Sequence, residues 1–164
     1  MKKTGSSAEK TNAMRLLDAA KISYGSVNYE QGPKMSGEDI AKILGEDSGR
    51  VFKTLVTEGR SGAHYVFVIP VNEELDLKKA AKAASEKSIA MIKQKDLLPL
   101  TGYIHGGCSP IGMKKAFPTF LHETAILYDD IYVSGGRLGC QICISADDLT
   151  AIAGCILSDI TSGG

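Results

Sequence analysis

The 164-residue sequence contains no tryptophan, and aromatic residues make up only 6% of it, so the core has to be built from aliphatic side chains. No stretch approaches the roughly 18 consecutive apolar residues that a membrane helix needs, and we therefore expect no membrane association. The lysines near the N-terminus are not followed by an apolar run, which argues against a secretory signal. These absences favour a cytoplasmic protein whose four cysteines are reduced thiols.

The sequence also lacks a net charge, which argues against a general nucleic-acid-binding protein. The charges are unevenly spread, however, since residues 78–115 hold 8 basic and 2 acidic side chains, whereas residues 116–164 hold 1 basic and 6 acidic ones. The lysines of residues 78–115 create a local positive field that suits phosphate groups. A solvated, lysine-rich surface without a ligand is the alternative, and the charges alone leave both interpretations open.

The length fits one domain, and we expect a flexible N-terminus at residues 1–10 and a single domain at residues 11–164. Apolar spacing and capping residues predict helices near residues 11–22, 36–45 and 77–84, and a last helix from Asp147 through Ile160. Short apolar segments predict strands, among them a meander at residues 119–121, 126–128 and 131–134. The mixture predicts an α+β fold, a mixed and largely closed β-barrel surrounded by helices.

Lys53 is the first candidate for chemistry, because it lies within the apolar segment VFKTLV. Alternation along a strand places Lys53 on the same face as Val51 and Leu55. A lysine on an apolar face is costly unless its ammonium group reaches water, a partner or a ligand. The sequence therefore leaves two interpretations, a functional lysine and a lysine on the solvent face of a half-buried strand.

Two glycine-rich segments, TGYIHGGCSPIG at 101–112 and SGGRLG at 134–139, are candidate binding loops. Glycine lets the backbone approach a ligand closely and present its N–H groups to phosphate or hydroxyl oxygens. Neither segment matches a phosphate-binding P-loop or a dinucleotide fingerprint, and tight turns explain such segments equally well. Arg137, between the glycines of the second segment, is a candidate to bind a phosphate through its guanidinium group, although a glycine-rich hairpin without a ligand explains the segment as well.

The cysteines and histidines form no recognisable local site. Cys140 and Cys143 are three residues apart on a predicted strand and therefore point to opposite faces, which disfavours a metal site or a disulfide. Cys155 is expected in the core, and Cys108 in the first glycine segment is the one thiol to consider as a nucleophile. None of the three histidines stands beside a serine or aspartate as part of a local triad.

Five segments together resemble the YbaK family, whose members are freestanding Cys-tRNA(Pro) deacylases related to the editing domain of bacterial prolyl-tRNA synthetases. The resemblance extends from about residue 11 to residue 160. It rests on VFKTLV at 51–56, LDLKKAAKA at 75–83, TGYIHGGCSPIGMKK at 101–115, IYVSGGRLG at 131–139 and the closing DDL segment.

The resemblance implies a pocket for the 3′-terminal aminoacyl-adenosine, with no cofactor and no metal. The family's key lysine corresponds to Lys53, and a tyrosine on an early strand corresponds to Tyr29. Its substrate-binding segments correspond to Gly102, Gly106, Gly107 and Ser109, together with Gly136 in the second glycine segment. Gln141 stands where the family often has an aspartate, which places in doubt any role that needs a carboxylate there.

The resemblance also implies substrate assistance, in which the thiol of the attached cysteine attacks its own ester carbonyl while Lys53 stabilises the developing charge. The expected partners are the 3′ end of mischarged tRNA(Pro) and prolyl-tRNA synthetase. Three alternatives remain: a deacylase for another small amino acid such as alanine, a tRNA- or synthetase-binding module without catalysis, and a redox protein that uses Cys140 and Cys143.

Overall fold

The computed structural model describes residues 9–32 and 34–163. The flexible N-terminus predicted at residues 1–10 therefore lies almost wholly outside the described residues, and the division into residues 1–10 and 11–164 stays a prediction. Within the described ranges, no helix is long and apolar enough to cross a membrane. The helices are α1 (Asn12–Ala19), α2 (Gly37–Leu44), α3 (Leu77–Ala84), α4 (Gln94–Thr101), the 3-10 helix η1 (Glu123–Leu127) and α5 (Ala146–Ala153).

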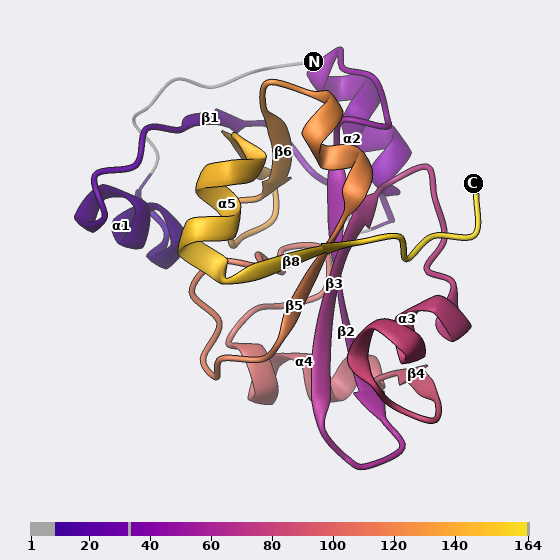
Figure 1. Cartoon of the computed structure of the whole chain (residues 1–164). Helices are drawn as coiled ribbons and strands as arrows, with labels where there is room; N and C mark the ends of the chain where they lie inside the picture. The colour runs from indigo at the N-terminus through magenta and orange to yellow at the C-terminus, as the bar shows by residue number, and fades with distance from the viewer. Residues whose placement is uncertain (1–8, 33, 164) are drawn as a thin grey trace.

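The strands form two sheets, and Figure 1 shows β2, β3 and β5 of the larger sheet below β1 and β6 of the smaller one. One sheet has three antiparallel strands in the order β1-β7-β6, and the other has five strands in the order β4-β2-β3-β5-β8. In the larger sheet β5 is parallel to both β3 and β8. The strands are β1 (Gly25–Asn28), β2 (Phe52–Gly59), β3 (His64–Pro70), β4 (Ile89–Met91), β5 (Thr119–His122), β6 (Ile131–Ser134), β7 (Cys140–Ile144) and β8 (Cys155–Ser158).

Local signals in the sequence set the ends of the helices. Ser36 caps α2 through a reciprocal capping box with Asp39, and Gly45 ends this helix in the left-handed conformation with φ 70°. The Thr11 hydroxyl accepts a hydrogen bond from the Met14 N–H at the start of α1. These caps confirm the helices predicted near residues 11 and 36.

The predicted α+β class is confirmed, but the largely closed barrel is wrong. Among the described residues, the two sheets remain open and share one isolated parallel bridge, between Val51 and Tyr132. The Tyr132 N–H donates to the Arg50 carbonyl oxygen beside this bridge. Beyond this bridge β2 and β6 form no ladder, although Val51 leads directly into β2 and Tyr132 lies within β6.

Two further predictions from the sequence are wrong. Residues 126–128 fall mostly in η1 rather than in a strand, and β5 joins the larger sheet, so there is no meander through residues 119–134. The last helix ends at Ala153, since Gly154 adopts φ 67°, and Cys155 begins β8. Parallel pairing of β8 with β5 buries Cys155 and thereby overrides the helical spacing of the segment.

The main core lies between the two sheets and the helices α1 and α5. Phe52 and Val66 from the larger sheet pack in one cluster with Val133 and Ile142 from the smaller sheet. Leu17 of α1 is fully buried in this cluster, and burial of one leucine side chain contributes about 1.5–3 kcal/mol. This shared core holds the sheets together where backbone hydrogen bonds do not.

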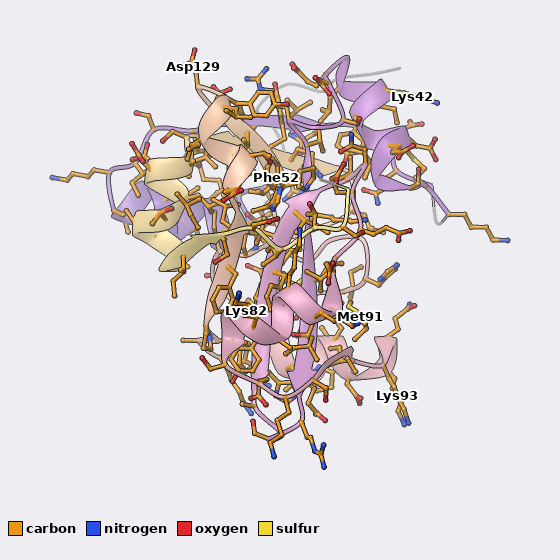
Figure 2. The ribbon with its side chains drawn as sticks, turned by 45° about the vertical axis from the view of Figure 1, so that its right-hand side comes forward. Lys42, Phe52, Lys82, Met91, Lys93 and Asp129 are labelled. Atoms are coloured by element: carbon orange, nitrogen blue, oxygen red, sulfur yellow. The ribbon has the colours of Figure 1, made fainter. Side chains whose placement is uncertain are left out.

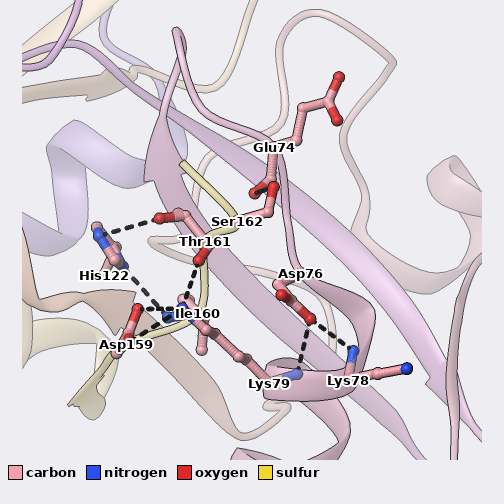
Figure 3. A network of polar contacts seen from close by, with 9 residues as sticks. All are labelled: Glu74, Asp76, Lys78, Lys79, His122, Asp159, Ile160, Thr161 and Ser162. Carbon is pink, nitrogen blue, oxygen red and sulfur yellow. Dashed lines mark hydrogen bonds and ion pairs between the residues drawn. The ribbon is translucent and has the colours of Figure 1, made fainter. Parts of the chain in front are cut away.

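A polar network fixes the C-terminal segment against the larger sheet (Figure 3). The buried His122 side chain accepts a hydrogen bond at Nδ1 from the Ile160 N–H at 3.3 Å, and its Nε2 lies 3.3 Å from the Thr161 hydroxyl. Burial lowers the pKa of His122, which favours the neutral ring that can accept at Nδ1. Lys79 of α3 pairs with Asp159 and also donates to the Thr161 carbonyl oxygen.

Candidate active site

A cavity of about 390 Å³ lies between the two sheets, beside the first half of β2. In Figure 2, Phe52 lies near the middle of the molecule, whereas Met91 and Lys93 lie nearer its right-hand side. Phe52 and Met91 both line the cavity. The lining comes from β2 (residues 52–56), the start of α2 (35–37 and 40), β4 and α4 (91, 92, 94 and 97), and Gln31, Val71, His105, Gly106, Cys108, Ser134 and Gln141.

Within residues 9–32 and 34–163, Lys53 is the one lysine that lines this cavity, and its side chain is half-buried. Burial lowers the pKa of the Lys53 ammonium group, while the charges of Glu74 and Glu38 act in the opposite direction. Among the described residues, the Lys53 side chain has neither a hydrogen bond nor an ion-pair partner. A partly desolvated ammonium group without a partner, placed beside a cavity, is suited to bind a negatively charged group of a ligand or to stabilise negative charge that develops on it.

Tyr29 lies behind the cavity wall, in a chain of polar contacts. The Gln141 side-chain Nε2 donates to the Tyr29 hydroxyl at 3.2 Å, and that hydroxyl donates to Gln31 Oε1 at 3.4 Å. Gln31 Oε1 also accepts from the Gly139 N–H at 2.8 Å. Burial raises the pKa of Tyr29 to about 12, so its phenol stays protonated at neutral pH. Tyr29 thus positions the two glutamines, both of which line the cavity.

Two polar atoms of the cavity-lining residues are buried without a hydrogen-bond partner in the protein, Thr54 Oγ1 and Gln141 Oε1. Gln141 is only 4% exposed, and its amide is held on one side by Tyr29. Leaving a buried polar atom unpaired costs about 1–3 kcal/mol. The Gln141 oxygen belongs to a residue of the cavity wall and is therefore available to accept a hydrogen bond from a ligand.

Three of the eight site residues predicted from the sequence line the cavity, namely Lys53, Gly106 and Gln141. Tyr29 contacts Gln141 from behind, and the remaining four do not line the cavity: Gly102, Gly107, Ser109 and Gly136.

Those four residues have clear places in the fold. Gly102 caps α4 with φ 82°, and the buried Ser109 hydroxyl accepts from the Ile111 N–H. A Cβ atom on Gly107 would lie 2.9 Å from the Arg137 backbone, so glycine permits the two glycine-rich segments to touch. Gly136 adopts φ 104° and donates its N–H to Ser134 Oγ, on a residue that does line the cavity. Their substrate-binding role stays a prediction.

Sequence reasoning missed Gln31, Thr54, His105 and Ser134 as lining residues, and it left the start of α2 out of the site. The capping box at Ser36 marked a helix start, and a helix N-terminus carries partial positive charge, so that signal was present in the sequence. Gln31, by contrast, is held at the cavity by a contact with Gly139, 108 residues further along the chain.

Arg137 does not face the cavity. Its guanidinium donates to the Glu9 carbonyl oxygen and to Asn28 Oδ1, so it ties the second glycine-rich segment to β1 and to the start of the described chain. The phosphate contact considered for Arg137 therefore has less support than its structural role.

The four cysteines are free thiols, and the structure does not favour a redox pair. Cys140 is fully buried and Cys143 is partly exposed on the same strand, and burial raises the pKa of both thiols. Within residues 9–32 and 34–163, no group of three His, Cys, Asp or Glu side chains is arranged to hold a metal ion.

Cys108 lines the cavity, but its environment makes it a poor nucleophile. Its side chain is 7% exposed, and burial raises the pKa of the thiol to about 12. The thiolate is the nucleophilic form, and it is scarce at neutral pH when the pKa is this high. For the deacylation that the sequence resemblance implies, we expect the Cys108→Ser variant to keep a rate within about threefold of the parent chain, measured by release of the amino acid from charged tRNA. The expectation would be contradicted if the Cys108→Ser variant were inactive and a thiol-alkylating reagent inactivated the parent chain to the same extent.

Comparisons with known proteins agree with this geometry. Residues 31–152 match the family model of the aminoacyl-tRNA editing domain. The chain is 46% identical over 155 residues to EbsC of Enterococcus faecalis, named as a candidate Cys-tRNA(Pro)/Cys-tRNA(Cys) deacylase, with 94% of each chain covered. It is 30% identical over 100 residues to a proline–tRNA ligase of Thermosipho melanesiensis, of which it covers 17%.

A solved structure supports the fold. A protein described as a candidate trans-editing enzyme for prolyl-tRNA synthetase superposes with a TM-score of 0.82, at 22% identity, over 94% of this chain and 100% of that one.

Proposed function

The chain belongs to the aminoacyl-tRNA editing domain family, and we propose that it is a trans-editing deacylase that clears Cys-tRNA(Pro). The observation that carries this proposal is the unpaired, half-buried Lys53 in the wall of a cavity of about 390 Å³. Such a volume is within the range of small-molecule sites and accommodates the end of an aminoacyl-adenosine. We place the activity in the cytoplasm, with prolyl-tRNA synthetase as the partner that supplies the mischarged tRNA.

The chemistry that we propose uses the substrate's own thiol as the nucleophile. The sulfur attacks the ester carbonyl, a carbon–sulfur bond forms, the carbon–oxygen bond to the ribose breaks, and the ribose oxygen takes up a proton. Water then opens the resulting thiolactone and releases cysteine. Lys53 would stabilise the negative charge that develops during the first step. This scheme fits a cavity whose lining thiol, Cys108, is held protonated by burial.

The tRNA would be held by its phosphates as well as by its 3′ end. Lys93 and Lys95 flank Gln94, which lines the cavity, and the exposed Lys114 follows α4 along the chain, its N–H bonded to the Thr101 carbonyl oxygen. These lysines have no ion-pair partner among the described residues. Phosphate contacts of this kind make binding weaken as the salt concentration rises.

A second function, tRNA binding without catalysis, is favoured by one residue. Gln141 stands at the position where related enzymes often carry an aspartate, and a neutral amide cannot act as a general base. Deacylation and simple binding therefore need to be separated by experiment.

The test compares two tRNA(Pro) substrates that differ only at the thiol, cysteinyl-tRNA and 2-aminobutyryl-tRNA, which has a methyl group in place of the SH group. We expect cysteine to be released at least about 100-fold faster than 2-aminobutyrate. The 2-aminobutyryl group lacks the thiol, so it loses most of the rate enhancement that an intramolecular nucleophile provides. Equal release of both amino acids would reject substrate assistance and leave a general deacylase, whose range alanyl-tRNA(Pro) would then define. No release from any of them, together with measurable tRNA binding, would establish the binding module.

A further inference from the structure

The strand β2 has a gap along one edge, and this gap faces the cavity. β2 pairs with β3 from Phe52 to Glu58, but on its other side it pairs with β4 only from Thr57 to Gly59. Before β2 begins, Val51 forms the single bridge to Tyr132. Between these two contacts, none of the described strands pairs with residues 53–55 on this side, and those residues line the cavity.

The register shows which backbone groups point into the gap. The Val71 N–H donates to the Val51 oxygen and the Gly59 N–H donates to the Ala63 oxygen, so odd-numbered residues of β2 exchange hydrogen bonds with the β3 side. In an antiparallel pair such residues alternate with residues whose N–H and C=O point the other way. The Ile92 N–H donates to the Val56 oxygen, as this alternation requires. Thr54 therefore directs both its N–H and its C=O toward the cavity.

We propose that the aminoacyl group of the substrate binds to the free edge of β2 and forms two hydrogen bonds with the backbone of Thr54. An aminoacyl ester carries a donor, the α-ammonium group, and an acceptor, the carbonyl oxygen, on the two sides of one Cα atom. That arrangement matches a residue in a hydrogen-bonded antiparallel pair, which exchanges both bonds with the residue opposite. The ammonium group donates to the Thr54 oxygen, and the ester carbonyl accepts from the Thr54 N–H.

This inference rests on the proposed function and adds a residue to it. The Thr54 N–H would strengthen its hydrogen bond as negative charge develops on the ester carbonyl oxygen, as backbone donors do in acyl-transfer enzymes. Lys53, the preceding residue, lies at the same cavity wall. The main chain, rather than a side chain, then selects for an α-amino acid, while the cavity selects its side chain.

The test uses two substitutions at Thr54. Proline removes the N–H, and at an unpaired edge position it removes no ladder hydrogen bond, so the sheet is expected to persist. Valine keeps both backbone groups, and it sacrifices no hydrogen bond because Thr54 Oγ1 has no partner in the protein. The probe is the non-hydrolysable amide analogue of 3′-cysteinyl-adenosine, with affinity measured by calorimetry and folding checked by circular dichroism.

We expect Thr54→Pro to bind the analogue at least about 10-fold more weakly than the parent chain, and Thr54→Val to bind within about threefold. A folded Thr54→Pro variant with the affinity of the parent chain would overturn the inference. If Thr54→Pro does not fold, the deaminated analogue, 3-mercaptopropionyl-amino-adenosine, decides. It is expected to bind the parent chain at least about 10-fold more weakly, because it cannot donate to the Thr54 oxygen, and equal affinity would overturn the inference.

Failure of the proposed function gives a different result. A parent chain that binds the analogue through Thr54 but releases no amino acid from any tRNA would refute the deacylase and leave the docking mode intact.

Discussion

The Lys53→Met variant is expected to deacylate Cys-tRNA(Pro) about 100- to 1,000-fold more slowly than the parent chain, the loss typical of removing one positioned electrostatic group from an acyl-transfer site. Methionine keeps an unbranched stem of similar length, so the packing of β2 changes little. The substitution removes the Lys53 ammonium group, which has no ion-pair partner among the described residues. Burial already lowers the pKa of this group, which means that burial disfavours its charged form. Stability is therefore expected to stay the same or to rise.

Single-turnover kinetics, with thermal unfolding alongside, would separate the two effects. Lys42→Met is the matched control, because Lys42 is an exposed lysine on α2 that does not line the cavity (Figure 2). It should retain the parent rate. A Lys53→Met variant that is folded and as fast as the control would exclude Lys53 from the chemistry.

The Gly139→Ala variant is expected to lose about 2–5 kcal/mol of unfolding free energy. Gly139 adopts φ 72°, and a Cβ atom there would lie 2.2 Å from the Tyr29 carbonyl oxygen. Tyr29 and Gly139 are also joined by a hydrogen bond of 2.9 Å from the Tyr29 N–H to the Gly139 oxygen. The methyl group would separate these two segments and displace the chain from Tyr29 to Gln31 that orients the cavity wall.

Urea unfolding would measure this loss, with Gly154→Ala as the matched control. Gly154 has a similar φ of 67°, but no atom lies within 4 Å of a Cβ built there, so only the backbone penalty of about 1 kcal/mol is expected. Equal losses of unfolding free energy in the two variants would contradict this prediction. They would show that the structure relieves the contact with Tyr29 at no cost, and that the positive φ alone causes both losses.

The elements whose ends depend on neighbouring residues were predictable from the sequence. α2 begins at a capping box and ends at a left-handed glycine, and both signals lie within ten residues of each other. Sheet order depends on contacts between distant segments, and for that reason the parallel pairing of β5 with β3 and β8 was not visible. The pairing of β8 with β5 also explains why Cys155, which was expected in a helix, is the first residue of a strand.

The candidate site divides in the same way. Lys53 could be found from the sequence because a charge within VFKTLV conflicts with its apolar neighbours. Gln31 could not, because its place depends on contacts with the second glycine-rich segment. The backbone groups of Thr54 leave no mark in the sequence at all, since every residue type except proline has the same N–H and C=O.

The single bridge between the sheets has a consequence for the energetics of binding. Lys53 belongs to one sheet and Gln141 to the other, and both line the cavity. A ligand that contacts both residues adds a connection between two sheets that, among the described residues, share one β-bridge and a common core. Because such a ligand binds only when the two sheets are packed together, its binding raises the free energy needed to separate them. The bound substrate would thus stabilise the packing of the two sheets, and its hydrolysis and release would remove that added stability.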